Sequence, residues 1–172
     1  MTPPPTQIAP LEPPDSHHLS AAEGWLELGD PAEAVAELRC IGPEHAGHPA
    51  VLELNWQIHA RLGQWEICLE LASRLVRRHP GLPTGWVHRS FALHELKRTE
   101  EARDQLLPAV AQFPNETVMA YNLACYECRL GNLAMARRWL KHIFARPNSQ
   151  PWRLVAQQDA DLAPLQAEME LL

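Results

Sequence analysis

The chain has 172 residues, of which 46% are hydrophobic, enough for one domain whose apolar core needs no disulfide or metal. A formal net charge of -6 at pH 7 disfavours nucleic acid as the main partner, because phosphate binding requires a basic surface. No apolar run approaches the roughly 20 residues that span a bilayer, and the first residues, MTPPPTQ, lack the features of a signal peptide. We therefore expect a cytoplasmic protein with no membrane partner, whose four cysteines stay reduced.

Residues 1–15 form a proline-rich tail with six prolines and almost no helix signal. Such a segment is typical of a solvated, polyproline-like chain. Two interpretations stay open: the tail is free, or it docks on its own domain or on a neighbour.

Residues 16–146 carry the periodicity of short amphipathic helices separated by helix-ending residues. The predicted helices are 17–28, 31–41, 50–62, 65–79, 84–96, 99–113, 117–130 and 133–145. None is long enough to be stable alone, so each must be buried against the others. They form four predicted hairpins, at about 16–48, 49–82, 83–116 and 117–146.

One pattern recurs every 34 residues through these hairpins. The breaks between paired helices fall at Gly29, Gly63, Lys97 and Gly131. Each break follows a leucine, and small residues stand five positions later: Ala34, Cys68, Ala102 and Ala136. The repeated leucines suggest a core position, so Leu130→Ala is expected to cost roughly 2–5 kcal/mol.

This period and its positions resemble the tetratricopeptide repeat (TPR) family, over residues 17–146. The third hairpin fits best, with the following residues in the family's positions: Trp86, Arg89, Ser90, Leu93, Ala102, Leu106, Ala109 and Pro114. Single positions depart from the family, such as Trp56 at a small position and Glu127 at an aromatic one. The resemblance implies an all-α, right-handed α-solenoid of four TPR hairpins, similar to a stand-alone bacterial TPR protein.

Residues 147–172 are predicted to form a C-terminal helical cap, since a solenoid must cover the apolar end of its last repeat. We expect Trp152, Leu154 and Val155 to cover that end, and Leu162, Leu165 and Met169 to extend the cover. Asp159 and Asp161 are expected to face water.

In such a solenoid the first helix of each pair lines a concave groove, which is the predicted binding site. By helical phase the partner-binding residues are Glu53, Gln57, Arg61, Val87, His88, Phe91, His94, Glu95, Tyr121, Asn122, Cys125, Cys128 and Arg129. Phe91 and Tyr121 would be aromatic anchors among polar groups, as at peptide-binding hot spots. One TPR subclass grips a carboxylate with Lys, Asn and Arg, but only Asn122 matches it here.

These features favour a non-enzymatic adaptor that binds a protein or peptide, with no cofactor. The chain has no nucleophile elbow, phosphate-binding glycine loop or zinc-protease motif. One alternative is a self-assembling structural protein that forms a homo-oligomer. A second is a zinc or redox site at Cys125 and Cys128, near His88 and His94. A further histidine group could converge near the first hairpin: His17, His18, His45 and His48.

Overall fold

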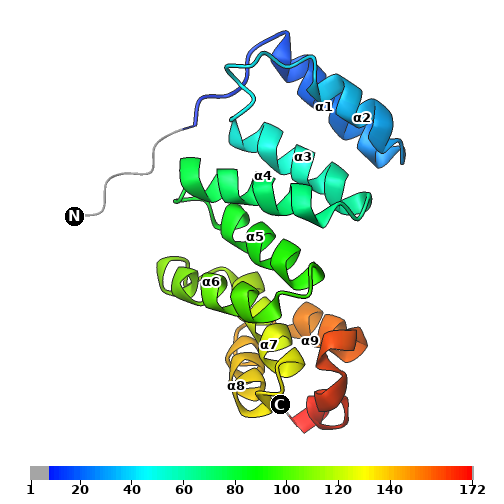
Figure 1. The fold of residues 1–172 in the computed structure, drawn as a ribbon. Helices are drawn as coiled ribbons and strands as arrows, with labels where there is room; N and C mark the ends of the chain where they lie inside the picture. Colours follow the sequence, from blue (N-terminus) through cyan, green and yellow to red (C-terminus); the bar gives the residue numbers. More distant parts are fainter. Residues whose placement is uncertain (1–7, 172) are drawn as a thin grey trace, which may run out of the picture. The chain divides into compact units, whose positions relative to one another are not determined.

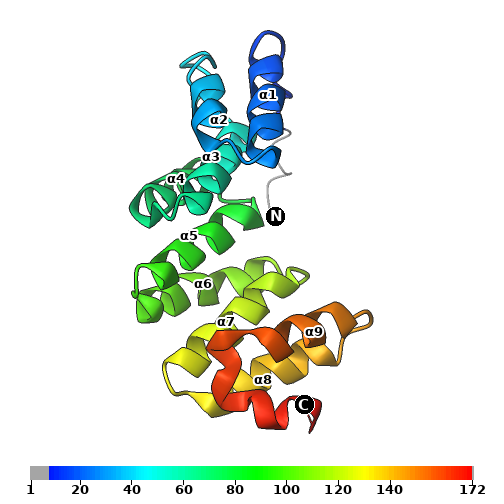
Figure 2. The same cartoon turned by 90° about the vertical axis from the view of Figure 1, so that its right-hand side faces the viewer.

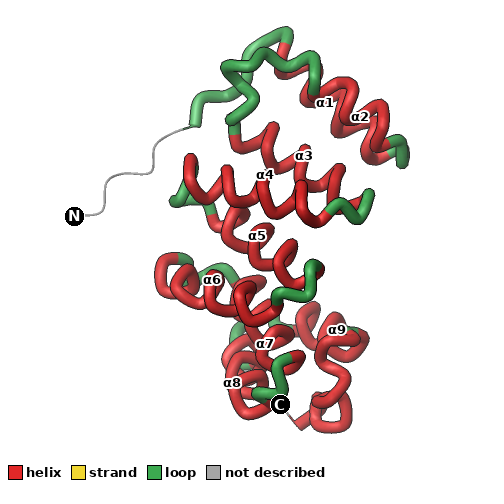
Figure 3. Tube along the Cα trace, in the orientation of Figure 1, coloured by secondary structure: helices red, strands yellow, loops and turns green. Residues whose placement is uncertain are grey.

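A computed structural model describes residues 8–171, apart from the side chain of Glu170, and those residues form helices joined by loops, without strands (Figure 3). The first five helices are α1 (Asp15–Glu27), α2 (Pro31–Leu38), α3 (Pro49–Arg61), α4 (Trp65–Arg78) and α5 (Pro83–Glu95). They are followed by α6 (Thr99–Gln112), α7 (Thr117–Arg129), α8 (Leu133–Phe144), α9 (Gln150–Gln158) and a 3₁₀ segment, η1 (Ala160–Leu171). The all-α prediction is confirmed for the described residues.

The eight predicted helices are present, and each begins within two residues of its predicted start. Local chemistry explains this agreement. The Asp30 carboxylate accepts a hydrogen bond from the backbone N–H of Glu33 at 3.2 Å, and Pro31 occupies the first turn of α2. His48 caps α3 in the same way, through Nδ1 and the backbone N–H of Ala50 at 3.3 Å.

The chain divides into two compact units, residues 1–88 and 89–172, with the boundary inside α5. In the first unit α1 packs along α2, α3 packs along α4, and α1 also contacts α3 (Figures 1 and 2). One buried cluster joins α1, α2 and α3, made of Ala22, Leu26, Ala34, Leu54 and Ile58. Burial of this shared apolar face holds these three short helices together.

In the second unit α7 is the central helix, packed by α6, α8 and η1. Nine of the ten positions of α7 from Met119 to Cys128 are buried, and Asn122 is the exception. The segment after α8 turns back through α9, so that η1 contacts both α7 and α8 (Figure 2). A helix surrounded on several sides needs apolar residues around most of its circumference, as α7 has.

The repeated small position is fully buried in all four hairpins, since Ala34, Cys68, Ala102 and Ala136 each have 0% exposed surface. The four breaks share a left-handed backbone, with φ of 84° at Gly29, 66° at Gly63, 64° at Lys97 and 82° at Gly131. Glycine adopts that conformation without steric cost, whereas a side chain resists it. The 34-residue period is therefore a period of backbone conformation as well as of residue type.

Lys97 is the non-glycine member of this series, so replacing it should stabilise the protein. We expect Lys97→Gly to raise the free energy of unfolding by about 0.5–1 kcal/mol, because relief of left-handed strain exceeds the added entropy of the unfolded chain. Urea denaturation measures this difference. Gly131→Lys, the reverse change at the equivalent break, should lower stability; equal stability of both variants and the wild type would contradict the strain.

The repeated leucine before each break is not the core position that the sequence suggested. Leu28 is 79% exposed and Leu62 is 45% exposed, while Leu96 and Leu130 are half-buried. Leu28, Leu62 and Leu130 are C-cap residues, one position beyond the last helical residue, and so lie outside the packed face. The fully packed environment assumed for Leu130 is therefore wrong, and we expect Leu130→Ala to cost less than the roughly 2–5 kcal/mol of a buried leucine.

Between residues 8 and 171, no helix combines the length and the apolarity needed to cross a membrane.

The prediction of a proline-rich tail concerns residues 1–15, and residues 1–7 lie outside the described part of the chain. In the described part of that tail, the backbone carbonyl of Ala9 lies 3.0 Å from His48 Nε2, and the Asp15 carboxylate hydrogen-bonds to Gly42 and His45.

Candidate functional site

Three of the predicted groove residues lie on one face of α3, because Glu53, Gln57 and Arg61 are spaced by four. They face α1 across a groove of about 420 Å³, which we call the α1–α3 groove. Its polar lining consists of Glu23, Glu27, Glu53, Gln57 and Arg61, and its apolar lining of Leu26, Ala50 and Leu54. The groove lies entirely within the first unit.

Sequence reasoning missed the side of this groove that α1 provides. Glu23 and Glu27 stand 34 residues before Gln57 and Arg61, so the repeat period itself could have identified them. The first hairpin is the least regular of the four, which concealed this correspondence.

Arg61 is held at the edge of the groove by the end of α1. Its Nη1 donates a hydrogen bond to the backbone carbonyl of Leu26 at 2.6 Å, and that carbonyl belongs to the last turn of α1. A cation at a helix C-terminus interacts favourably with the helix dipole. Arg61 thus joins α3 to α1 and fixes one end of the groove.

His88 and Val87, also predicted groove residues, lie on the part of α5 that belongs to the first unit. The His88 ring stacks on Trp56, with ring centroids 3.8 Å apart and planes inclined by 4°. Burial lowers the pKa of His88 to about 4, so the ring is neutral at physiological pH. Val87 and His88 are both half-buried, which leaves them little surface for a partner.

In the second unit, the predicted groove residues of α7 are covered by the segment after α8, which contains α9 and η1 and which we call the covering segment. Tyr121 has 6% exposed surface, and its hydroxyl donates a hydrogen bond to Asp159 Oδ2 at 2.7 Å. The Tyr121 ring also packs on Trp152, with centroids 5.2 Å apart. Tyr121 is thus occupied by its own chain and not available as an anchor, while Phe91 is 37% exposed.

A second set of contacts joins the covering segment to α5 and α7. His94 Nε2 lies 2.8 Å from Asp161 Oδ2, and Arg129 Nε lies 3.5 Å from Asp161 Oδ1. The prediction that Asp159 and Asp161 face water is therefore wrong, because both carboxylates bind groups on the helices they cover. The remaining predicted residues of this unit, Glu95 and Asn122, are half-buried.

The covering segment also differs from the predicted cap in its first helix. Leu154 is 53% exposed and Val155 is 52% exposed, whereas Ala156 is fully buried. The inward face of α9 therefore carries Trp152 and Ala156, one helical turn apart. As predicted, Leu162, Leu165 and Met169 are buried, at 0%, 0% and 3% exposure.

The two cysteines of α7 lie beneath this segment. Burial raises the pKa of both the Cys125 and Cys128 thiols above the ordinary value, and nearby aspartates add to the shift. Zinc binding and thiol exchange both require the thiolate. This environment disfavours the alternative of a zinc or redox site at these residues.

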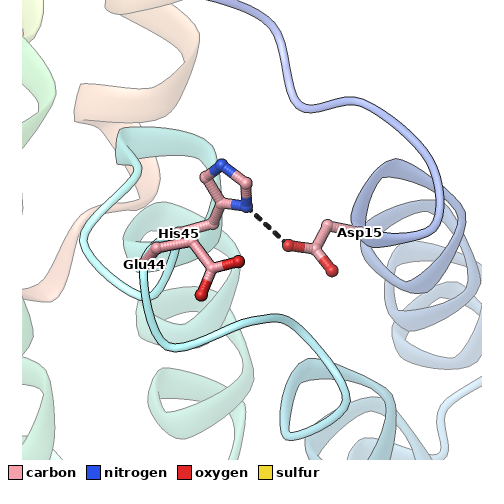
Figure 4. Close-up of side chains that lie close together, drawn as sticks. All are labelled: Asp15, Glu44 and His45. Atoms are coloured by element: carbon pink, nitrogen blue, oxygen red, sulfur yellow. Dashed lines mark hydrogen bonds and ion pairs between the residues drawn. The ribbon is translucent and has the colours of Figure 1, made fainter.

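The histidines near the first hairpin have separate partners. His18 Nδ1 lies 2.8 Å from Glu37, His48 bonds to Ala9, and His45 Nδ1 lies 2.6 Å from Asp15 Oδ2. Figure 4 shows Asp15, Glu44 and His45 close together, with one ligand atom from each within 4.8 Å of the others. Asp15 also accepts a hydrogen bond from the backbone N–H of Gly42, so this cluster joins α1 to the loop before α3.

Asp15 should make the stability of the protein depend on pH in the acidic range. Its hydrogen bond to His45 lowers the carboxyl pKa below the ordinary 3.8, so the ionised form is favoured in the folded state. Its stabilising contribution is present above pH 3.8 and is lost as the pH falls below that value. We expect Asp15→Asn to lower the free energy of unfolding near neutral pH, measured by urea denaturation. The variant should also lose less of that free energy than the wild type between pH 5 and pH 2. Parallel pH profiles for variant and wild type would contradict this role.

No family model and no curated protein matches this chain.

Proposed function

We propose that this protein is a non-enzymatic binding module, an adaptor or scaffold that holds a segment of a partner protein. We infer a four-hairpin TPR architecture with a C-terminal cap. The left-handed breaks and the buried small residues, both recurring every 34 residues, support this architecture. The described cysteines are all free thiols, which supports a cytoplasmic location.

The observation that carries the proposal is the α1–α3 groove. It has a volume of about 420 Å³, with buried Leu26 and Leu54 at its base and charged side chains at its edges. A concave surface with apolar contacts and a few placed polar groups is the usual make-up of a ligand site. A preformed groove between packed helices also reduces the ordering cost of binding.

The free-energy cost of making a binding surface accessible is lower for this groove than for the face of α7. A partner on α7 must first displace a segment that buries Leu162, Leu165 and Met169. Full burial of one such side chain contributes about 1.5–3 kcal/mol, so displacement would consume most of the free energy of a typical association. The α1–α3 groove requires no such displacement.

Selection of a random peptide display library on the full chain tests the proposal. We expect binding peptides to slow amide hydrogen exchange in α1 and α3. Gln57→Trp places a bulky side chain on an exposed position of the groove and should abolish binding. Gln157→Trp is the matched control, because it makes the same change at an exposed position of α9 and should leave binding intact. Peptides that bind both variants equally, or a selection without binders, would reject the proposal.

A further inference from the structure

The α1–α3 groove contains more negative charge than its own chain neutralises. Three carboxylates line it, from Glu23, Glu27 and Glu53, against the single guanidinium of Arg61. Arg61 donates to the carbonyl of Leu26 and forms no ion pair with a carboxylate among the described residues. Within residues 8–171 the three carboxylates have neither a hydrogen-bond partner nor an ion-pair partner.

Glu53 is the most enclosed of the three. Its side chain is half-buried on α3, whereas Glu23 and Glu27 are exposed on α1. Burial raises the pKa of the Glu53 carboxyl, which means that its charged form is desolvated without a nearby cation to compensate. A cation that entered the groove would supply the missing partner.

The distribution of charge along the chain agrees with this local picture. Residues 1–88 contain 11 Asp and Glu against five Lys and Arg, while residues 89–172 contain ten of each class. The first unit therefore carries the whole formal net charge of -6. Such a field attracts a basic partner and accelerates its association.

We infer that the α1–α3 groove binds a protein segment in which an Arg or Lys stands beside an apolar side chain. The cation pairs with Glu53 and with the α1 carboxylates Glu23 and Glu27, and the apolar neighbour packs on Leu26 and Leu54. This inference rests on the proposed function and specifies the chemistry of the partner.

The spacing of the carboxylates selects a side chain over a metal ion. Among the described residues, the group with ligand atoms within 4.8 Å of one another is Asp15, Glu44 and His45, and the groove glutamates are not part of such a group. A guanidinium or ammonium on a flexible stem can reach carboxylates that are farther apart. The apolar base of the groove can contact the aliphatic stem of the same side chain.

The peptides selected on the full chain provide the test. We expect them to be enriched in Arg or Lys. Citrulline keeps the shape of arginine without its charge. A selected peptide whose basic residue is replaced by citrulline should bind at least about tenfold more weakly. Glu53→Gln in the protein should weaken binding by a similar factor. The matched control is Glu33→Gln with Glu66→Gln, which removes two exposed carboxylates of the same unit outside the groove. It should change the affinity by less than about twofold, because exposed charges at a distance are screened by salt.

The outcomes separate the two proposals. Selected peptides could slow hydrogen exchange in α1 and α3 and yet bind equally well in their arginine and citrulline forms. That result would overturn the basic partner but would keep the groove as the binding site. Equal weakening by Glu53→Gln and by the double control would also overturn it, because attraction would then come from net charge alone. Peptides that protect no part of α1 or α3 would reject the groove itself. Concentration-dependent self-association abolished by Glu53→Gln would replace the proposed partner with a second copy of the chain.

Discussion

Replacing Leu140 with alanine should lower the free energy of unfolding by about 2–5 kcal/mol, because the cavity left by a buried leucine is only partly filled by its neighbours. Leu140 has 0% exposed surface and lies in α8, whose buried face packs on α7. It occupies the same repeat position as Leu106, which is also fully buried. Urea denaturation followed by tryptophan fluorescence measures the change.

Leu28→Ala is the control for this prediction, since the same atoms are removed where the side chain is 79% exposed. Its effect should lie within about 0.5 kcal/mol of zero. Leu130→Ala, at a half-buried C-cap position, should fall between the two. A larger cost for Leu28→Ala or Leu130→Ala than for Leu140→Ala would contradict the packing, and would restore the core role that the repeat first suggested for these leucines.

The helices could be predicted from the sequence because their signals are local. Apolar spacing, Asp30 with Pro31, and the glycine breaks each act within one or two turns. Lys97 shows the strength of the period, since its position among three glycines indicated a break although lysine itself does not favour a left-handed backbone.

Burial at the ends of helices could not be predicted in the same way. Four identical leucines at constant spacing resemble a core position, but whether a C-cap side chain is covered depends on what packs beyond the helix end. At Leu28 the side chain is largely exposed. Residue identity in a repeat therefore does not by itself indicate burial.

The candidate site was only partly predictable for a related reason. The α3 residues Glu53, Gln57 and Arg61 follow from helical phase, and they do line a groove. Coverage of Tyr121 and Cys125 depends on where the segment after α8 turns, which periodicity does not specify. The hydrogen bond that Tyr121 donates to Asp159 and the contact of His94 with Asp161 join positions far apart in sequence.

Ending the chain at Asn148 should destabilise the second unit by at least about 4 kcal/mol, since full burial of each large apolar side chain contributes about 1.5–3 kcal/mol and ordering entropy offsets only part of that sum. The truncation removes Leu162, Leu165 and Met169, which are buried in the full chain. It also removes the acceptor of the Tyr121 hydroxyl. We expect a lower urea midpoint, with loss of the near-ultraviolet circular dichroism of the aromatic residues.

Thiol reactivity shows whether the covering segment is part of the core or a detachable ligand of α7. In the full chain Cys40 is exposed, whereas Cys68, Cys125 and Cys128 are buried and should react slowly with Ellman's reagent. Truncation should make Cys125 and Cys128 react at a rate near that of Cys40. Leu154→Ala, at a position 53% exposed on α9, should change neither stability nor reactivity. If the truncated chain kept the full stability while Cys125 became reactive, the segment would be a detachable occupant of α7. The second unit would then offer a binding face of its own, and the argument that confines partner binding to the α1–α3 groove would fail.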